Sequence, residues 1–170
     1  LNVNAPNMAS ATGSWVLRFA ELDEEASKRE GPLMALRTDP QTDLAGPVPL
    51  RKVDPRYPPA LKDIFDPPPL LFARGRVELL NTLMLGVVGT RRPSAYGTAA
   101  AGKLAKDLAL AGLTIVSGMA RGIDTSAHRS ALEAGGATIA VFGCGVDQTY
   151  PAENRKLAEQ IAAQGLILSE

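Results

Sequence analysis

The chain has 170 residues, of which 45% are hydrophobic and 21% charged, and its formal net charge is zero. This composition predicts a soluble globular protein with one main domain and room for a small companion. No apolar run approaches the roughly 20 residues of a membrane span, and no signal-peptide pattern opens the chain, so a membrane partner is not expected. The single Cys144 excludes an internal disulfide framework and favours a reducing cytoplasm.

Positive charge is unevenly distributed along this neutral chain. Between Gly86 and Arg129 there are six basic residues against two acidic ones, whereas acidic residues dominate from Ser130 onward. A local basic patch in a neutral protein indicates a defined anion site rather than a diffuse polyanion-binding surface. Solvated helix faces would give the same count. The basic residues are Arg91, Arg92, Lys103, Lys106, Arg121 and Arg129.

Two segments are expected before the main domain. Residues 1–46 show helical spacing of apolar side chains around Trp15 and Phe19, which predicts a short helical N-terminal segment. Residues 47–82 are rich in proline, which forbids long helices and central strands. Because this stretch also carries many apolar side chains, including Phe65 and Leu71, we expect an ordered connector packed on the main domain rather than a free linker.

Residues 83–170 alternate short apolar strands with helical stretches. Strands are predicted at 84–88, 113–117, 138–142 and 166–169, and helices at 95–112, 124–136 and 152–165. Gly112, Gly135 and Gly165 stand where helix C-caps are expected. This pattern predicts an α/β fold, a Rossmann-like parallel sheet with right-handed crossovers and helices on both faces. Because the last residues lie in the fourth strand, we expect the domain to be truncated at its C-terminal end.

Three loops follow predicted strands and should meet at one edge of this sheet. They are the first loop, residues 89–94; the second loop, residues 117–124; and the third loop, residues 143–154. Ligands of such sheets bind beyond the carboxyl ends of the strands, where helix N-termini converge. All three loops contain glycines, which let backbone N–H groups approach a ligand, and the first two contain arginines. The sequence therefore predicts an anion site here.

The first loop matches neither of the common nucleotide-binding motifs. The dinucleotide pattern G-x-G-x-x-G is absent after the first strand, and Ser117 rather than an acidic residue ends the second. The P-loop pattern occurs nowhere in the chain. Gly89, Thr90, Arg91 and Arg92 still form a credible phosphate seat, because arginine pairs bidentately with phosphate. The alternative is a tight turn with two solvated arginines.

The second loop offers an anion site but no complete catalytic or metal constellation. Ser117, Gly118 and Arg121 could contact a phosphate, while Asp124 is expected to cap the following helix. His128 lies one helical turn after Asp124. However, an Asp–His pair without a positioned nucleophile cannot carry out nucleophilic catalysis, so a packed or helix-capping histidine is favoured. One histidine and one cysteine cannot form a convincing metal site, so no catalytic residue, metal or cofactor is predicted.

The third loop leads into the last predicted helix. Pro151 suits the first turn of a helix, and Tyr150 before it either packs as a lid or stacks on a base, with packing favoured. Arg155 and Lys156 lie in the first turns, where cations do not favour the helix dipole. This indicates that one of them faces an anion.

These motifs together resemble one protein family. The blocks "VVGTRRPSAYG", "GLTIVSGMARGIDTSAHRSALEAGGATIAVFGCGVDQTYPAENRKLAEQI" and "GLILSE" resemble the DNA-processing protein A family (DprA/Smf), and "VDPRYPPALKDIFDPPPLLFARGRVELL" resembles its lead-in. The resemblance begins at about Val53. It implies a cytoplasmic bacterial protein of natural transformation that binds and protects incoming single-stranded DNA and helps load the RecA recombinase. It further implies a homodimer without enzymatic activity or cofactor.

The resemblance also implies which residues bind DNA. The family's anion pocket falls here on Arg91 with Arg92, on its "SG-x-A-x-GID" block from Ser117 to Asp124, and on Lys156. Residues 1–46 are short for the family's helical module of the sterile-alpha-motif or helix-hairpin-helix type. The family's later "RNR" block is absent from the sequence.

Both lines of reasoning lead to one expected mechanism. A backbone phosphate of a single strand would enter the crevice above the strand ends. The backbone N–H groups of Gly89 and Gly118 and the charges of Arg91, Arg121 and Lys156 would hold it. Binding would be sequence-tolerant and salt-sensitive, with groove shape selecting single strands. Two rivals stay open: a sensor of a nucleotide or other small ligand in the same crevice, and a nucleotide hydrolase. The second is disfavoured because the "PGG-x-GT-x-x-E" motif of related phosphoribohydrolases is absent.

Overall fold

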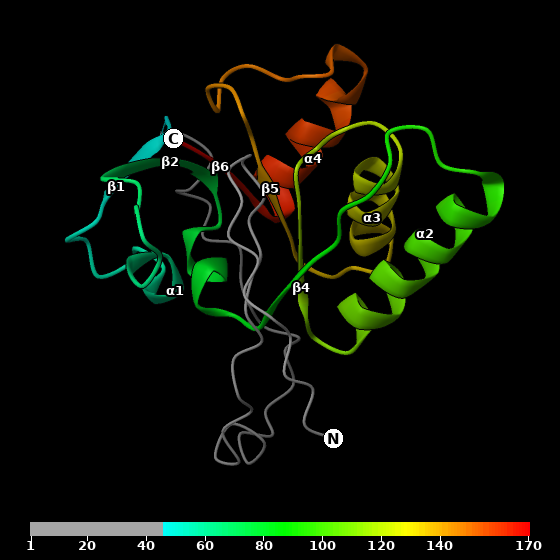
Figure 1. Cartoon of the computed structure of the whole chain (residues 1–170), viewed down its shortest axis with the longest axis horizontal. Coiled ribbons are helices and arrows are strands. Elements are labelled where there is room, and N and C mark those ends of the chain that lie inside the picture. Colours follow the sequence, from blue (N-terminus) through cyan, green and yellow to red (C-terminus); the bar gives the residue numbers. More distant parts are fainter. Residues whose placement is uncertain (1–45) are drawn as a thin grey trace.

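Residues 46–170 are described by the computed structural model of the chain, so the helical segment expected at 1–46 lies outside the described residues except for Gly46. A six-stranded sheet forms the centre of this part (Figure 1). The strands are β1 (Val48–Arg51), β2 (Leu70–Gly75), β3 (Met84–Gly86), β4 (Thr114–Ser117), β5 (Thr138–Val141) and β6 (Leu166–Ser169). The helices are α1 (Pro59–Lys62), η3 (Val77–Asn81), α2 (Ala95–Leu110), α3 (Ile123–Glu133), η4 (Ala152–Asn154) and α4 (Arg155–Gln164).

The sheet has the order β1-β2-β6-β5-β4-β3, and its two halves differ in direction. β3, β4, β5 and β6 are parallel neighbours, whereas β2 pairs antiparallel with β6 and β1 antiparallel with β2. The predicted Rossmann-like α/β fold is therefore confirmed, but the sheet is mixed rather than purely parallel. The four parallel strands and their helices match the predicted elements within a few residues.

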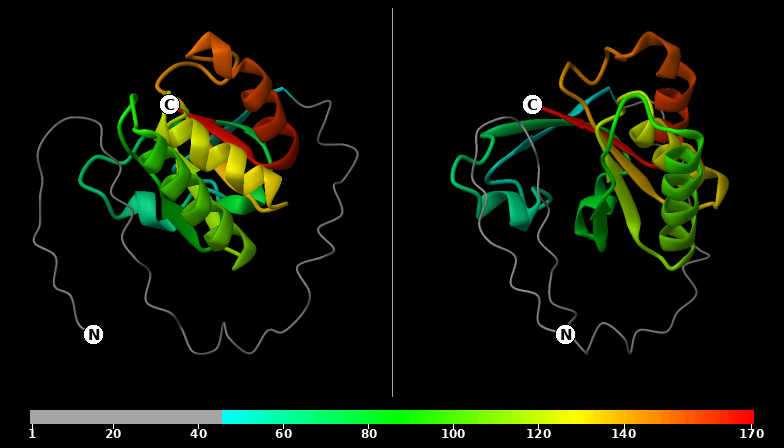
Figure 2. Two further views of the ribbon diagram at one scale, coloured as in Figure 1. Left: turned by 90° about the vertical axis from the view of Figure 1, so that its right-hand side faces the viewer. Right: turned by 45° about the vertical axis from the view of Figure 1, so that its right-hand side comes forward.

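Helices lie on both faces of the sheet, but unequally. The parallel strands follow one another in a single direction across the sheet, so right-handed crossovers place α2, α3 and α4 on the same face. Figures 1 and 2 show these three helices together on one side. In the described part of the chain, the other face carries α1 and η3, with Leu79, Leu80 and Tyr57 packed in a core against Ile139 and Leu168.

Two strands come from the proline-rich segment 47–82, where central strands were not expected. Pro49 lies within β1, which is an edge strand in the described chain and tolerates the missing N–H. β2 begins directly after Pro67–Pro69 and inserts between β1 and β6. Its buried Leu71 and Ala73 alternate with exposed Phe72 and Arg74, the two-residue period of a strand with one buried face.

Small residues allow α2 and α3 to pack closely. α2 begins after Ser94, whose hydroxyl accepts a hydrogen bond from the Gly97 N–H at 3.1 Å as an N-cap. Its buried side chains are all alanines, which favour helix formation and leave room for the neighbouring helix. Ala127 and Ala131 of α3 complete this core around Ile115 of β4. The packing fixes the N-termini of both helices beside the carboxyl ends of β3 and β4.

None of the helices in residues 46–170 is long and apolar enough to cross a membrane.

Candidate functional site

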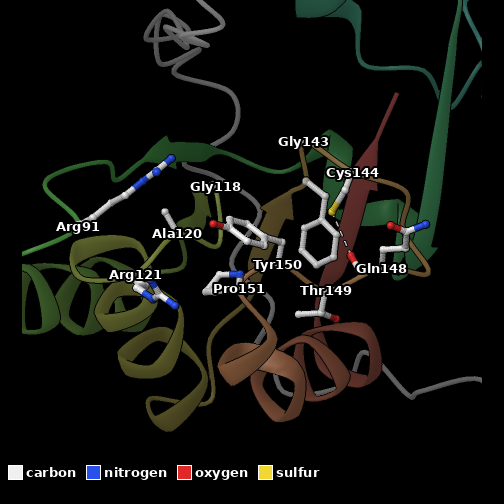
Figure 3. A pocket seen from close by; sticks show the side chains of 11 residues that line it. Arg91, Gly118, Ala120, Arg121, Gly143, Cys144, Gln148, Thr149, Tyr150 and Pro151 are labelled. Atoms are coloured by element: carbon white, nitrogen blue, oxygen red, sulfur yellow. Dashed lines mark hydrogen bonds between the residues drawn. The ribbon is translucent and has the colours of Figure 1, made fainter.

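A cavity of about 520 Å³ opens where the three loops meet, at the carboxyl ends of the parallel strands (Figure 3). Its volume lies in the range of small-ligand sites, about 300–1,000 Å³. The second loop supplies one wall and the third loop the other, and Arg91 of the first loop stands at the rim. The lining residues are Arg91, Gly118, Ala120, Arg121, Phe142, Gly143, Cys144, Gln148, Thr149, Tyr150 and Pro151.

Two glycines lock the first loop onto the second. Gly122 has φ +80°, and a Cβ there would press against the Thr90 carbonyl oxygen and lie 2.7 Å from Pro93 Cδ. A Cβ on Gly89 would lie 2.7 Å from a side-chain carbon of Ile123. The Ile123 N–H also donates a hydrogen bond to the Thr90 carbonyl at 3.3 Å. The glycines thus allow the close approach that places Arg91 beside the second loop.

Asp124 organises the second loop from within. Its carboxylate accepts the backbone N–H groups of Gly118 at 3.1 Å and Ala120 at 3.3 Å. Met119 between them has φ +60°, a left-handed conformation that L-residues rarely adopt. Asp124 was expected to be the N-cap of α3, but the N-cap is Gly122 and Asp124 is a buried residue of the first turn. Its carboxylate stabilises the loop ahead of the helix instead.

Two predicted phosphate donors are already engaged inside the protein. The Ser117 side chain is buried, and its hydroxyl donates a 2.6 Å hydrogen bond to the Val87 carbonyl. The Gly118 N–H donates to Asp124, as described above. Both donors therefore hold the loops together in this structure. The sequence predicted that both groups face an anion, whereas in the structure they bond to other parts of the protein. The sequence does not show these internal partners.

Arg121 forms an ion pair at the cavity. Its guanidinium donates to both carboxylate oxygens of Glu153 on η4, at 2.8 Å and 3.0 Å, and both side chains are more than half exposed. These hydrogen bonds, and then the charge of Glu153, raise the pKa of Arg121. The same hydrogen bonds lower the pKa of Glu153. An exposed pair of this kind contributes little to stability.

Of the remaining predicted site residues, only Arg91 lines the cavity, and the others lie outside the lining set. Arg91 is exposed at the rim, and no ion pair in the described part of the chain involves it. Gly89, Thr90 and Arg92 are exposed in the first loop, where the Arg92 N–H donates to the Thr90 hydroxyl at 3.2 Å. Lys156 is exposed on α4. The predicted site residues outside the lining set are Gly89, Thr90, Arg92, Ser117 and Lys156.

Asn154 is a structural residue of the site that the sequence analysis overlooked. Its buried side-chain amide donates to the Met119 carbonyl at 3.0 Å and to the Thr125 hydroxyl at 2.8 Å. It thereby ties the third loop to the second across the cavity. The signal in the sequence is a polar residue directly before the apolar spacing of α4, a pattern that also suits an ordinary helix cap.

Tyr150 is exposed, contrary to the expectation that it packs. Its side chain is 71% accessible and lines the cavity, whereas Pro151 beside it is buried. In Figure 3 the ring lies between the two arginines on one side and Cys144 with Gln148 on the other. Of the two predicted roles for Tyr150, packing as a lid or stacking on a base, the exposed ring is compatible with stacking.

His128 is a core residue, as predicted. The ring is fully buried, and Nδ1 lies 2.7 Å from the Thr138 hydroxyl oxygen, which itself donates to the Ile115 carbonyl. Cys144 donates its S–H to the Gln148 carbonyl at 3.1 Å. Among residues 46–170, no three His, Cys, Asp or Glu side chains gather as metal ligands would.

One protein family matches most of the chain. Residues 49–170 match the family described as DNA recombination-mediator protein A. The chain belongs to this family. The match spans all three loops and the lead-in strands β1 and β2 except for Val48, so the family resemblance seen in the motifs is confirmed.

The chain is similar to known proteins and to solved structures of this DNA recombination-mediator protein A family. The protein Smf of a Synechocystis species is 49% identical over 121 residues, which is 69% of this chain and 30% of the relative. The X-ray structure of DNA processing protein A from Streptococcus pneumoniae is 40% identical with a TM-score of 0.69, covering 76% of this chain and 45% of that one.

A second solved relative is described by its ligand. The DNA processing protein A of Helicobacter pylori, characterised for its unique single-stranded DNA binding mode, is 39% identical with a TM-score of 0.65. The match covers 72% of this chain and 54% of that one. The chain therefore spans roughly half or less of the length of each of these relatives.

Proposed function

We propose that this chain binds single-stranded DNA through its backbone phosphates at the cavity between the first, second and third loops. The observation that carries the proposal is the pair of exposed guanidinium groups, Arg91 and Arg121, at one cavity beyond the carboxyl ends of the parallel strands. The relative from Helicobacter pylori supports it, because that family member binds single-stranded DNA.

In this proposal a phosphate docks beside Arg91 and draws Arg121 away from Glu153. Arginine suits the task because its planar donors match two phosphate oxygens at once. Arg92 and Lys156, which are also exposed, would hold further phosphates of the strand, and the exposed Gly89–Thr90 backbone would line its path. Contacts of this type carry no sequence information, so binding would be sequence-tolerant and would weaken with salt.

The proposed function is non-enzymatic. Two carboxylates at the second loop already have partners: Asp124 accepts two backbone N–H groups, and Glu153 pairs with Arg121. Neither is left as the free general base that hydrolysis of a bound nucleotide would need. The imidazole of His128 is enclosed in the core, away from any substrate.

We further propose that the chain takes part in natural transformation in the bacterial cytoplasm, where it protects incoming DNA and assists loading of the RecA recombinase as part of a homodimer. Family membership supports this wider role. A strand held by its phosphates would leave most of its bases accessible to a second protein.

The test is fluorescence anisotropy with a labelled oligo-dT length series at two salt concentrations. The variants are Arg91→Ala, Arg121→Ala and, as a matched control, Arg51→Ala. Arg51 is an exposed arginine on β1, far from the cavity in the strand order. Loss of one charge-assisted contact costs about 1–3 kcal/mol, or about 5- to 150-fold in affinity. We expect this loss for the two cavity arginines, and little change for the control.

Two results would count against the proposal. Equal losses for all three arginine variants would indicate a diffuse charge effect rather than a site. Saturation by the mononucleotide dTMP, with no gain on lengthening the oligonucleotide, would assign the cavity to a small ligand.

A further inference from the structure

The helix α2 buries its small side chains and exposes its large ones. Its buried residues are all alanines, whereas Tyr96, Leu104 and Leu110 are 83%, 60% and 63% exposed. A helix that packs on a core through one face normally places its large apolar side chains there. α2 is also the outermost helix of its layer, beyond α3 in Figures 1 and 2. It therefore presents a second apolar surface on its outer side.

The outer side of α2 has the spacing of a helix–helix contact. Positions 96, 100, 103, 107 and 110 follow one another at alternating steps of four and three, which aligns them in one stripe along the helix. This stripe is called the α2 seam below. Its residues are Tyr96, Ala100, Lys103, Asp107 and Leu110, and Leu104 lies beside them. A seam of this spacing favours another helix as its partner.

The charges in the α2 seam indicate that the partner is a second copy of the same helix. Lys103 and Asp107 form an ion pair at 2.8 Å within α2, and their side chains are 78% and 53% exposed. Lys before Asp is the weaker order for such a pair, so helix stability alone does not account for it. If two α2 helices pack antiparallel about a two-fold axis level with position 105, Lys103 of each copy lies opposite Asp107 of the other. The same register sets Leu110 opposite Ala100, a large side chain against a small one.

We propose that the α2 seam is a self-association surface, on which two copies of the chain pair their α2 helices antiparallel about a two-fold axis. This inference rests on the homodimer of the proposed function and assigns a surface to it. Charged side chains in a seam fix its register at a cost in stability, and α2 offers only 16 residues to the contact. The association should therefore be weak and dependent on concentration. None of the residues that line the cavity belongs to α2, so each copy keeps its own anion site.

The test is a charge exchange, measured by sedimentation velocity over a concentration series. Wild type should move from monomer to dimer as its concentration rises. Lys103→Asp and Asp107→Lys each set like charges against one another across the axis, so each variant alone should associate at least about 10-fold more weakly. An equimolar mixture of the two variants should associate again, because opposite charges then face each other. Neither chain of the mixture regains the ion pair within its own helix, so recovery can come only from contact between copies.

The matched control is the other exposed helical pair, Arg155 and Glu159 on α4. Arg155→Glu and Glu159→Arg should leave the association of the chain unchanged. A wild-type chain that stays monomeric at every concentration would overturn the proposal. Single Lys103 and Asp107 variants that associate like wild type would also overturn it, as would a mixture that stays monomeric.

These outcomes are separate from those that test DNA binding. A wild-type dimer that ignores the charge exchange would leave the homodimer standing and place its contact on another surface. An oligonucleotide short enough for one copy should bind the Lys103 and Asp107 variants with near wild-type affinity, since the cavity lies outside the seam. Failure of the DNA site would appear instead as wild-type binding by Arg91→Ala.

Discussion

The buried imidazole of His128 predicts a measurable dependence of stability on pH. The ring is fully buried, and Nε2 has no hydrogen-bond partner in the described structure. Because Thr138 donates its hydroxyl proton to the Ile115 carbonyl, its oxygen is left to accept from Nδ1–H, which makes the neutral ring the one that fits. Burial lowers the pKa of His128 from 6.5 to about 4, and the Ser117 backbone opposes this shift only in part.

The sign follows from the protons bound in each state. Above pH 6.5 the ring is neutral in both states and contributes nothing to the pH dependence. Between pH 6.5 and about 4, His128 binds a proton in the unfolded chain but not in the folded chain. The free energy of unfolding therefore falls as pH falls. One pKa unit corresponds to about 1.36 kcal/mol, which gives a loss of about 2 kcal/mol at pH 5 and about 3 kcal/mol at pH 4.

The assay is chemical denaturation from pH 7.5 to pH 4.5 on the wild type and on His128→Asn. Asparagine cannot titrate, and its side-chain amide can still donate to Thr138. Carboxylates with lowered pKa values, such as those of Asp54 and Glu153, titrate in both proteins and cancel in the difference. We expect the wild type to lose about 2 kcal/mol more than the variant by pH 5. The chain has one histidine, so its NMR signal also reports the pKa without assignment. Parallel stability curves, together with a histidine pKa near 6.5, would refute the reasoning.

Two further predictions concern the loops around the cavity. Glu153→Gln removes the charge that competes for Arg121, so single-stranded DNA should bind more tightly and the logarithmic salt slope should steepen by up to about 0.7. Asp107→Asn, which disrupts an exposed ion pair on α2, should change neither quantity in the same anisotropy assay. Gly122→Ala should lower the free energy of unfolding and weaken DNA binding, because its Cβ would collide with the backbone of the first loop. Gly135→Ala is the control, with φ +72° but open space around its Cβ; it should cost about 1–2 kcal/mol in denaturation and leave binding unchanged. Equal binding losses for the two glycine variants would contradict the proposed locking of the loops.

The core of the fold was readable from local patterns. The strand at 166–169 lies where its apolar run predicts, and α2, α3 and α4 begin or end within a few residues of the predicted bounds. These elements depend on spacing and caps that are written within a few residues of sequence. β1 and β2 were missed because proline density was given more weight than the alternation in "LLFARG", whose partner strand β6 lies more than 90 residues later.

The sequence by itself determined that three glycine-containing loops, two of them with arginines, meet at the carboxyl edge of a Rossmann-like sheet. Only the tertiary structure decided which polar groups there are free. Ser117 and Gly118 have internal partners, Arg121 is paired with Glu153, and Tyr150 is exposed rather than packed. The reason is that each of these outcomes depends on a competition between partners brought together by folding. Arg121 and Glu153 are 32 residues apart, and no local pattern records which side chain or backbone group a given donor will meet.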